Sequence, residues 1–129
     1  MPTSLPRELT RPVVVGSVQI GGGAPVVVQS MTCTPTLDTE ATLDQIRALA
    51  DGGCDVVRVT LPNRAAIDSF KAICDASPVP IIADIHFDYR LAIAAVDAGA
   101  AKLRINPGNI GSWEKVDAVI DAAGAAGAA

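Results

Sequence analysis

The chain repeats one pattern four times: a short aliphatic run, then a segment with apolar residues at helical spacing. The expected strands cover residues 26–28, 56–60, 81–85 and 102–105, and the expected helices follow at 39–51 and after the capping residues Asn63, Asp88 and Ser112. Successive strand–helix units predict an α/β fold with a parallel sheet and right-handed crossovers. Flavodoxin-like folds and (β/α)8 TIM-type barrels both begin in this way, and periodicity does not separate them.

The length of the chain limits how much of such a fold it holds. A complete eight-stranded barrel needs roughly 250 residues, whereas this chain has 129. Half of the residues are hydrophobic and only 3% are aromatic, which favours an aliphatic core between a sheet and its covering helices. We therefore expect a flexible lead-in at 1–10. Residues 11–129 would then form the amino-terminal half of a barrel, with about four strand–helix units.

The segment from Pro12 to Leu37 has no charged residue, which raises the question of a membrane span. It contains three prolines and a run of three glycines, and these would leave backbone groups unsatisfied in lipid. Residues 12–15 and 17–20 instead predict a short β-hairpin that leads into the main fold. We expect no membrane association.

Charge and cysteine usage exclude several classes of protein. The net charge is −4 and no basic block is present, which argues against binding to nucleic acid or to an anionic membrane surface. Cys33, Cys54 and Cys74 are odd in number and form no CxxC pair. We therefore expect neither a disulfide framework nor a metal site, and we expect a location in the reducing cytoplasm.

In parallel α/β folds, ligands bind at the carboxyl ends of the strands, and polar residues gather at those ends in this sequence. Arg58 and Arg104 lie in neighbouring apolar strands at equivalent positions. In one interpretation each arginine pairs with a structural carboxylate. In the other they bind phosphate, because a guanidinium presents a planar fork of donors and two of them would clamp a diphosphate.

Asp84 and His86 are two residues apart and therefore point to the same side of the expected third strand. His86 is suited to donate to a phosphate or a hydroxyl, with Asp84 orienting neighbouring groups or binding substrate hydroxyls. The alternative is a satisfied polar pair at a strand end. Asn106 follows the fourth strand at the same end of the sheet. No residue is assigned a catalytic role.

Four segments of the sequence resemble the 4-hydroxy-3-methylbut-2-enyl diphosphate synthase family. They are VQSMT (28–32), GCDVVRV (53–59), ADIHFDYRLA (83–92) and KLRINPGNIG (102–111). The resemblance covers nearly the whole chain, and the last two motifs in this order are highly specific.

The resemblance implies a reductive enzyme of the non-mevalonate isoprenoid pathway, which converts 2-C-methyl-D-erythritol 2,4-cyclodiphosphate to 4-hydroxy-3-methylbut-2-enyl diphosphate. It further implies a [4Fe-4S] cluster on a carboxy-terminal domain, ferredoxin or flavodoxin as electron donor, and a homo-oligomer. By motif position it implies one substrate site. The residues expected to bind the diphosphate are Arg58, His86, Arg104 and Asn106, with Asp84 as a polar wall.

Part of the family's pattern is absent from these 129 residues. The family continues into a second half-barrel and the iron–sulfur domain, and the three cysteines do not match the cluster ligands. We therefore expect this chain alone to be inactive. One alternative is a truncated, non-catalytic chain that only binds a diphosphate or self-associates. Another is a barrel similar to dihydropteroate synthase.

Four strand–helix units would leave two open sheet edges and an uncovered inner face. We therefore predict that the isolated chain is oligomeric or poorly soluble. Sedimentation at micromolar concentration tests this, and a monodisperse monomer would count against it.

Overall fold

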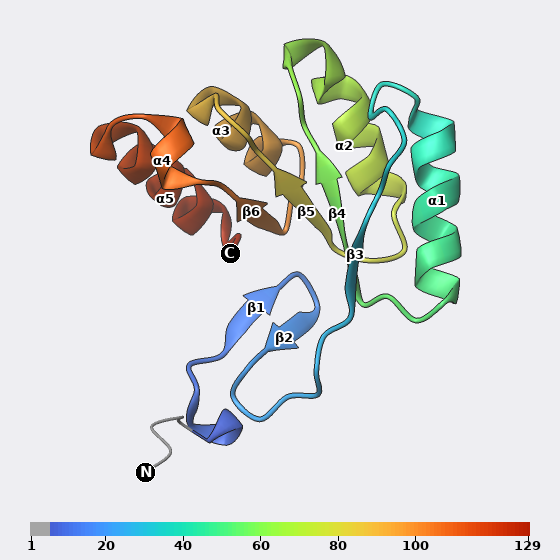
Figure 1. Ribbon diagram of the computed structural model, residues 1–129, viewed down its shortest axis with the longest axis vertical. Helices are drawn as coiled ribbons and strands as arrows, with labels where there is room; N and C mark the ends of the chain where they lie inside the picture. Colours follow the sequence, from blue (N-terminus) through green and yellow to red (C-terminus); the bar gives the residue numbers. More distant parts are fainter. Residues whose placement is uncertain (1–5) are drawn as a thin grey trace.

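The structure of the chain, a computed structural model, describes residues 6–129 (Figure 1). Within these residues a two-stranded antiparallel hairpin precedes a sheet of four parallel strands, whose spatial order β3-β4-β5-β6 follows the chain. The elements are η1 (Arg7–Leu9), β1 (Val13–Val15), β2 (Val18–Ile20), β3 (Gln29–Met31), α1 (Thr39–Asp51), β4 (Val56–Thr60), η2 (Arg64–Ala66), α2 (Ile67–Ala76), β5 (Ile81–Asp84), α3 (Tyr89–Asp97), β6 (Lys102–Arg104), α4 (Pro107–Ile110) and α5 (Trp113–Ala126).

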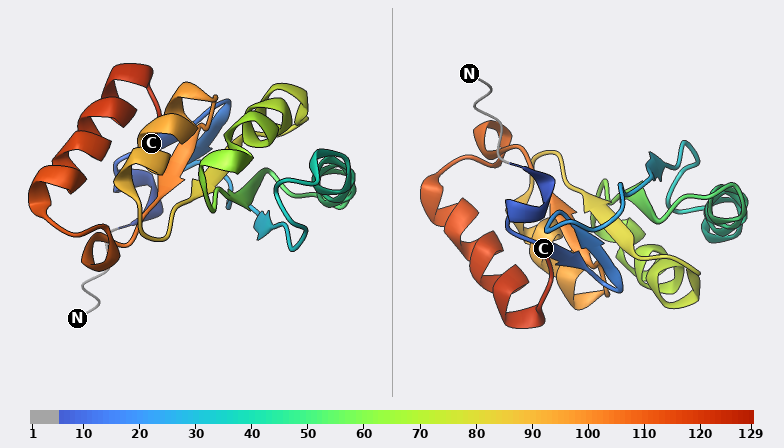
Figure 2. Two further views of the ribbon diagram at one scale, coloured as in Figure 1. Left: turned by 90° about the horizontal axis from the view of Figure 1, so that it is seen from above. Right: turned by 90° about the horizontal axis from the view of Figure 1, so that it is seen from below.

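The strand order separates the two folds that periodicity left open. In a flavodoxin-like sheet the spatial order of the first two strands is the reverse of their order in the chain, and helices cover both faces. Here the spatial order of the strands follows the chain throughout. Figure 2 shows α1, α2, α3 and α5 in an arc along one side of the sheet. Ile46, Phe70 and Ala92 from these helices share one buried core with Val59 and Ala83 of the strands. The α/β fold of barrel type is therefore confirmed, as an open half without closure.

The predicted capping residues hold the starts of the helical segments. Asn63 Oδ1 accepts from the backbone N–H of Ala66, and Ser112 Oγ accepts from that of Lys115. Asp88 caps α3 in the same way, and hydrogen bonds from Arg90 hold the pKa of the Asp88 carboxyl below its usual value. Each cap satisfies a backbone donor that has no partner within its helix.

The predicted hairpin is confirmed as β1 and β2, which pair from Val13–Ile20 to Val15–Val18. Its turn requires glycine, because Gly16 has φ +59° and a Cβ there would lie 2.9 Å from Pro80 Cγ. Val15 is fully buried against Val56 and Ile82, both from the sheet. The hairpin thereby covers the inner face of the sheet at the amino ends of its strands.

The first strand of the sheet begins three residues later than predicted. Residues 26–28 were expected to be a buried strand, but β3 begins at Gln29, and Val26 is 73% exposed. The valines cross from the hairpin to the sheet, where only Val28 has backbone partners: its carbonyl accepts from the N–H groups of Asp55 and Val56. Of the three valines only Val27 is partly buried, against the small cluster of Val15, Val56 and Ile82.

Two helices follow β6. The segment 106–109 ends the strand, and Pro107 opens the one-turn helix α4, which Asn106 caps. Proline suits the first position of a helix because its missing N–H would have no partner there. In α5, Val116 and Val119 face the core, whereas Ile120 is 58% exposed.

The sheet within residues 6–129 has β3 and β6 at its edges. After α5, the backbone of Ala129 bonds to the β6 segment in the pattern of a parallel ladder: its N–H donates to the Ala101 carbonyl, and its carbonyl accepts from the Leu103 N–H. Within the same residues, no helix is long and apolar enough to cross a membrane. Of the expected lead-in at 1–10, residues 1–5 lie outside the described part.

Candidate functional site

The pleat of the strands sorts their side chains onto two faces. Side chains that alternate with the helix-facing valines of β4 point to the inner face, and the parallel register aligns residues across strands. Arg58 pairs with Ile82, while Asp84 pairs with Thr60 on one side and with Arg104 on the other. Two arginines and one aspartate from three adjacent strands therefore meet on the inner face.

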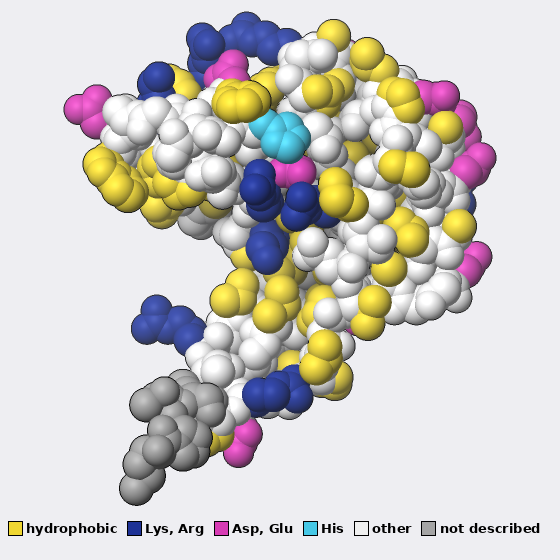
Figure 3. Space-filling model, in the orientation of Figure 1, with side chains coloured by type: hydrophobic (Ala, Val, Ile, Leu, Met, Phe, Trp, Pro, Cys, Tyr) yellow, Lys and Arg dark blue, Asp and Glu magenta, His cyan; other side chains and the backbone are white. Residues whose placement is uncertain are grey.

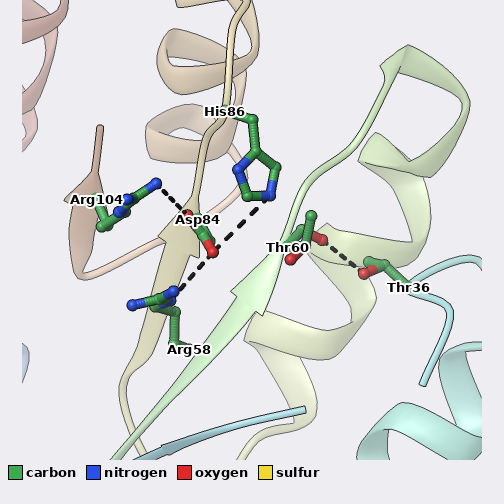
Figure 4. A network of polar contacts seen from close by, with 6 residues as sticks. All are labelled: Thr36, Arg58, Thr60, Asp84, His86 and Arg104. Carbon is green, nitrogen blue, oxygen red and sulfur yellow. Dashed lines mark hydrogen bonds and ion pairs between the residues drawn. The ribbon is translucent and has the colours of Figure 1, made fainter. Parts of the chain in front are cut away.

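Asp84 is the shared acceptor of both arginines (Figure 4). Arg58 Nε donates to Asp84 Oδ2 at 3.1 Å, and Arg104 Nη1 donates to Asp84 Oδ1 at 3.2 Å. The aspartate side chain is 1% exposed, so it depends on these partners in place of water. An unpaired buried carboxylate is strongly unfavourable, and two charge-assisted hydrogen bonds offset that cost.

The pairing leaves donors on both guanidinium groups. Each arginine uses one nitrogen on Asp84, and the Arg58 and Arg104 side chains remain 27% and 40% exposed. Both interpretations of the arginines are therefore compatible: they pair with a structural carboxylate, and their remaining N–H groups are free to meet an anion. Two cations against one carboxylate also leave the group positively charged.

His86 lies beside the same carboxylate. Its Nε2 is 3.9 Å from Asp84 Oδ2, which confirms that the two residues share a side but is too long for a hydrogen bond. The imidazole is about half exposed. It is therefore available to another partner at the carboxyl ends of the strands, which we call the mouth of the sheet.

Asn106 stands apart from the other predicted residues. It is exposed, and its Oδ1 accepts from the backbone N–H of Gly108 as the cap of α4. Within residues 6–129, no hydrogen bond or ion pair joins it to Arg58, Asp84 or Arg104. The structure thus brings four of the five predicted residues together and leaves Asn106 at the adjoining turn.

A cavity of about 360 Å³ opens beside the arginines on the inner face. Figure 3 shows basic side chains gathered in this hollow, next to the histidine. The lining residues are Gln29, Arg58, Ile82, Lys102, Leu103, Arg104 and Ile105. Sequence reasoning missed Lys102 and Gln29 as site residues. The alternation of Lys102, Leu103 and Arg104 would have revealed the lysine, since the first and third side chains share a face.

Two further cavities flank this one. His86 lines a pocket of about 230 Å³ with Leu61 and Phe87 at the carboxyl ends of the strands. A larger cavity of about 400 Å³ lies between the lead-in and β3 and is mostly apolar. Its single cation, Arg7, already donates to the Ala24 carbonyl. The position of the charges therefore favours the cavity beside Arg58 and Arg104 as an anion site.

The loop after β3 is held against the mouth of the sheet. Thr36 Oγ1 donates to the Thr60 carbonyl at 2.6 Å (Figure 4). Gln45 of α1 accepts from the Cys33 N–H and donates to its Sγ. These contacts fix the end of β4, next to the Asp84 cluster.

Within residues 6–129, no group of three or more histidine, cysteine, aspartate or glutamate side chains is placed to hold a metal ion. All three cysteines are free. Burial raises the pKa of the Cys74 thiol to about 12, and its side chain packs against the main core.

Comparison with known proteins decides the family. Residues 10–129 match the family described as GcpE TIM-barrel domain. The chain belongs to this family. The 4-hydroxy-3-methylbut-2-en-1-yl diphosphate synthase (flavodoxin) of Natranaerobius thermophilus is 58% identical over 117 residues, which cover 91% of this chain and 33% of that protein. The protein of the same name from Magnetococcus marinus is 58% identical over 118 residues, 92% of this chain and 32% of that protein.

This GcpE-type chain spans about a third of the length of those relatives. Among solved structures, a dihydropteroate synthase of Burkholderia cenocepacia superposes with a TM-score of 0.63 over 86% of this chain and 41% of that one. Its sequence identity is 19%, so the likeness concerns the fold alone. The alternative of a dihydropteroate synthase-like function gains no support from it.

The shared carboxylate generates a stability prediction. Asp84→Asn keeps the shape of the side chain but removes the charge that both guanidinium groups require, so it should lower the free energy of unfolding by about 3 kcal/mol. Asp75→Asn is the matched control, because it breaks an exposed pair with Lys71 and should cost less than about 1 kcal/mol. Urea unfolding of both variants gives the comparison. Equal stabilities would show that Asp84 is not a structural anchor.

Proposed function

We propose that the chain is the substrate-binding barrel portion of a synthase that reductively converts 2-C-methyl-D-erythritol 2,4-cyclodiphosphate to 4-hydroxy-3-methylbut-2-enyl diphosphate. The observation that supports this most is the pair of guanidinium groups held by Asp84 beside an open cavity. The names of the relatives support the reaction. No catalytic residue is proposed within these 129 residues.

In this proposal Arg58 and Arg104 bind the diphosphate through the nitrogens that Asp84 leaves free. Planar forks suit phosphate oxygens, and their orientation is set before the ligand arrives. His86 donates from the mouth side, and Asn106 contributes its amide N–H from the turn above β6. Asp84 forms the polar wall, and it acts through the arginines because both of its oxygens already accept from them.

The redox part of the reaction lies outside these residues. A [4Fe-4S] cluster supplies electrons in the family, but the described residues offer no ligands for one. We propose flavodoxin or ferredoxin as electron donor for a longer protein that contains this barrel; the names of the relatives include flavodoxin. We also propose a cytoplasmic location and a homo-oligomer.

A second candidate is a non-catalytic chain that binds a diphosphate or self-associates. It rests on the same two guanidinium groups beside the cavity. Both candidates need the anion site, and they differ in redox activity. Substrate turnover with reduced flavodoxin by a longer protein carrying this barrel would decide for the first.

Arg104→Ala tests the anion site. The variant should weaken binding of 2-C-methyl-D-erythritol 2,4-cyclodiphosphate by about 2 kcal/mol, roughly 30-fold, because it removes a charge-assisted donor and leaves the negative charge of Asp84 less neutralised. Titration calorimetry of the chain at low ionic strength measures this. Arg47→Ala is the control, since Arg47 is exposed and pairs with Asp44. Equal affinities for both variants would mean that Arg104 is structural.

A further inference from the structure

Lys102 is the first residue of β6, and its side chain lies on the same face of the sheet as Arg58 and Arg104. The register pairs Lys102 with Ile82, and Ile82 in turn with Arg58. The two cations therefore flank Ile82 in one row of the inner face, while Arg104 lies one row closer to the mouth. Residues two apart on a strand are separated by about 7 Å, which long side chains bridge easily.

No acidic group neutralises Lys102 in the part of the chain that the structure describes. Both Asp84 oxygens are engaged by arginines, and the ion pairs without Asp84 lie elsewhere: Arg47 with Asp44, Lys71 with Asp75, and Arg90 with Asp88. Lys102 takes part in no ion pair within 4.0 Å. Its side chain is half-buried and lines the cavity of about 360 Å³.

The charges around this cavity are unbalanced. Arg58, Lys102 and Arg104 face one carboxylate, so two positive charges remain in excess. Half-buried cations in a cavity with low-dielectric walls attract a small anion more strongly than the same charges in open water. An anion with at least two negative charges matches the excess.

On the basis of the proposed diphosphate site, we propose that Lys102 is a further anion-binding residue, which binds the second phosphate group. The arginines, fixed by Asp84, bind one phosphate group through their planar forks. The ammonium group of Lys102 binds the other as a flexible point charge. Lys102 is thereby the residue that makes the site prefer a diphosphate over a single phosphate.

The test compares inorganic pyrophosphate with orthophosphate as probes, by titration calorimetry of the 129-residue chain at low ionic strength. Lys102→Gln should weaken pyrophosphate binding about tenfold and orthophosphate binding less than about twofold, because only the diphosphate reaches the lysine. Lys102→Arg should restore pyrophosphate binding to within about threefold, since the charge is kept. Lys71→Gln is the control, because Lys71 pairs with Asp75 away from the cavity.

The outcomes separate the two proposals. If the wild-type chain binds no pyrophosphate, the proposed diphosphate site itself fails. If the wild type binds but Lys102→Gln binds equally well, or loses both probes equally, the role of Lys102 is wrong while the arginine site stands. Should Lys102→Gln not fold, acetylation of the wild type decides. Pyrophosphate, but not orthophosphate, should slow the reaction of acetic anhydride with Lys102, and unchanged rates would overturn the proposal.

Discussion

The buried carboxylate of Asp84 is the interaction on which the site depends. A charge that is 1% exposed requires partners, and here Arg58 and Arg104 supply them from the strands on either side. The same contacts hold three strands in register at their carboxyl ends and orient two guanidinium groups toward one cavity. Stability and anion binding thus rest on one group. Removing Asp84 would therefore disturb both, whereas removing Lys102 would leave the shared ion pairs intact.

The rest of the fold keeps this inner face open at one end. The helices bury the other face of the sheet, where aliphatic side chains such as Val59 and Ala83 form the main core. The hairpin seals the amino ends of the strands with Val15. The inner face remains uncovered toward the carboxyl ends of the strands, where each strand contributes a polar side chain. This division follows from the two-residue period of the strands, and it explains why a chain of net charge −4 holds a local cationic site.

The sequence predicted the order of elements, the hairpin and the grouping of Arg58, Asp84 and His86, because each depends on local periodicity or on strand ends meeting at one edge. It did not predict that Val26 and Val28 stay exposed, since burial depends on neighbours that the local pattern does not specify. Ile120 is exposed for the same reason, although its spacing matches that of the buried valines of α5. Lys102 was missed because a charged residue at the start of a strand, just after the turn at Gly99, resembles a solvated strand end. The contact of Asp84 with both arginines could not be predicted, because it depends on the register of three strands, which the local sequence does not specify.

The most direct test of the account is a proton–nitrogen correlation spectrum of the arginine Nε–H groups, recorded with and without inorganic pyrophosphate. The Arg58 Nε–H donates to a buried carboxylate, so we predict a slowly exchanging signal in the free chain. Pyrophosphate should shift the signals of Arg58 and Arg104 and leave that of the exposed Arg47 unchanged. Unchanged Arg58 and Arg104 signals, or equal shifts at all arginines, would contradict a diphosphate site organised by Asp84.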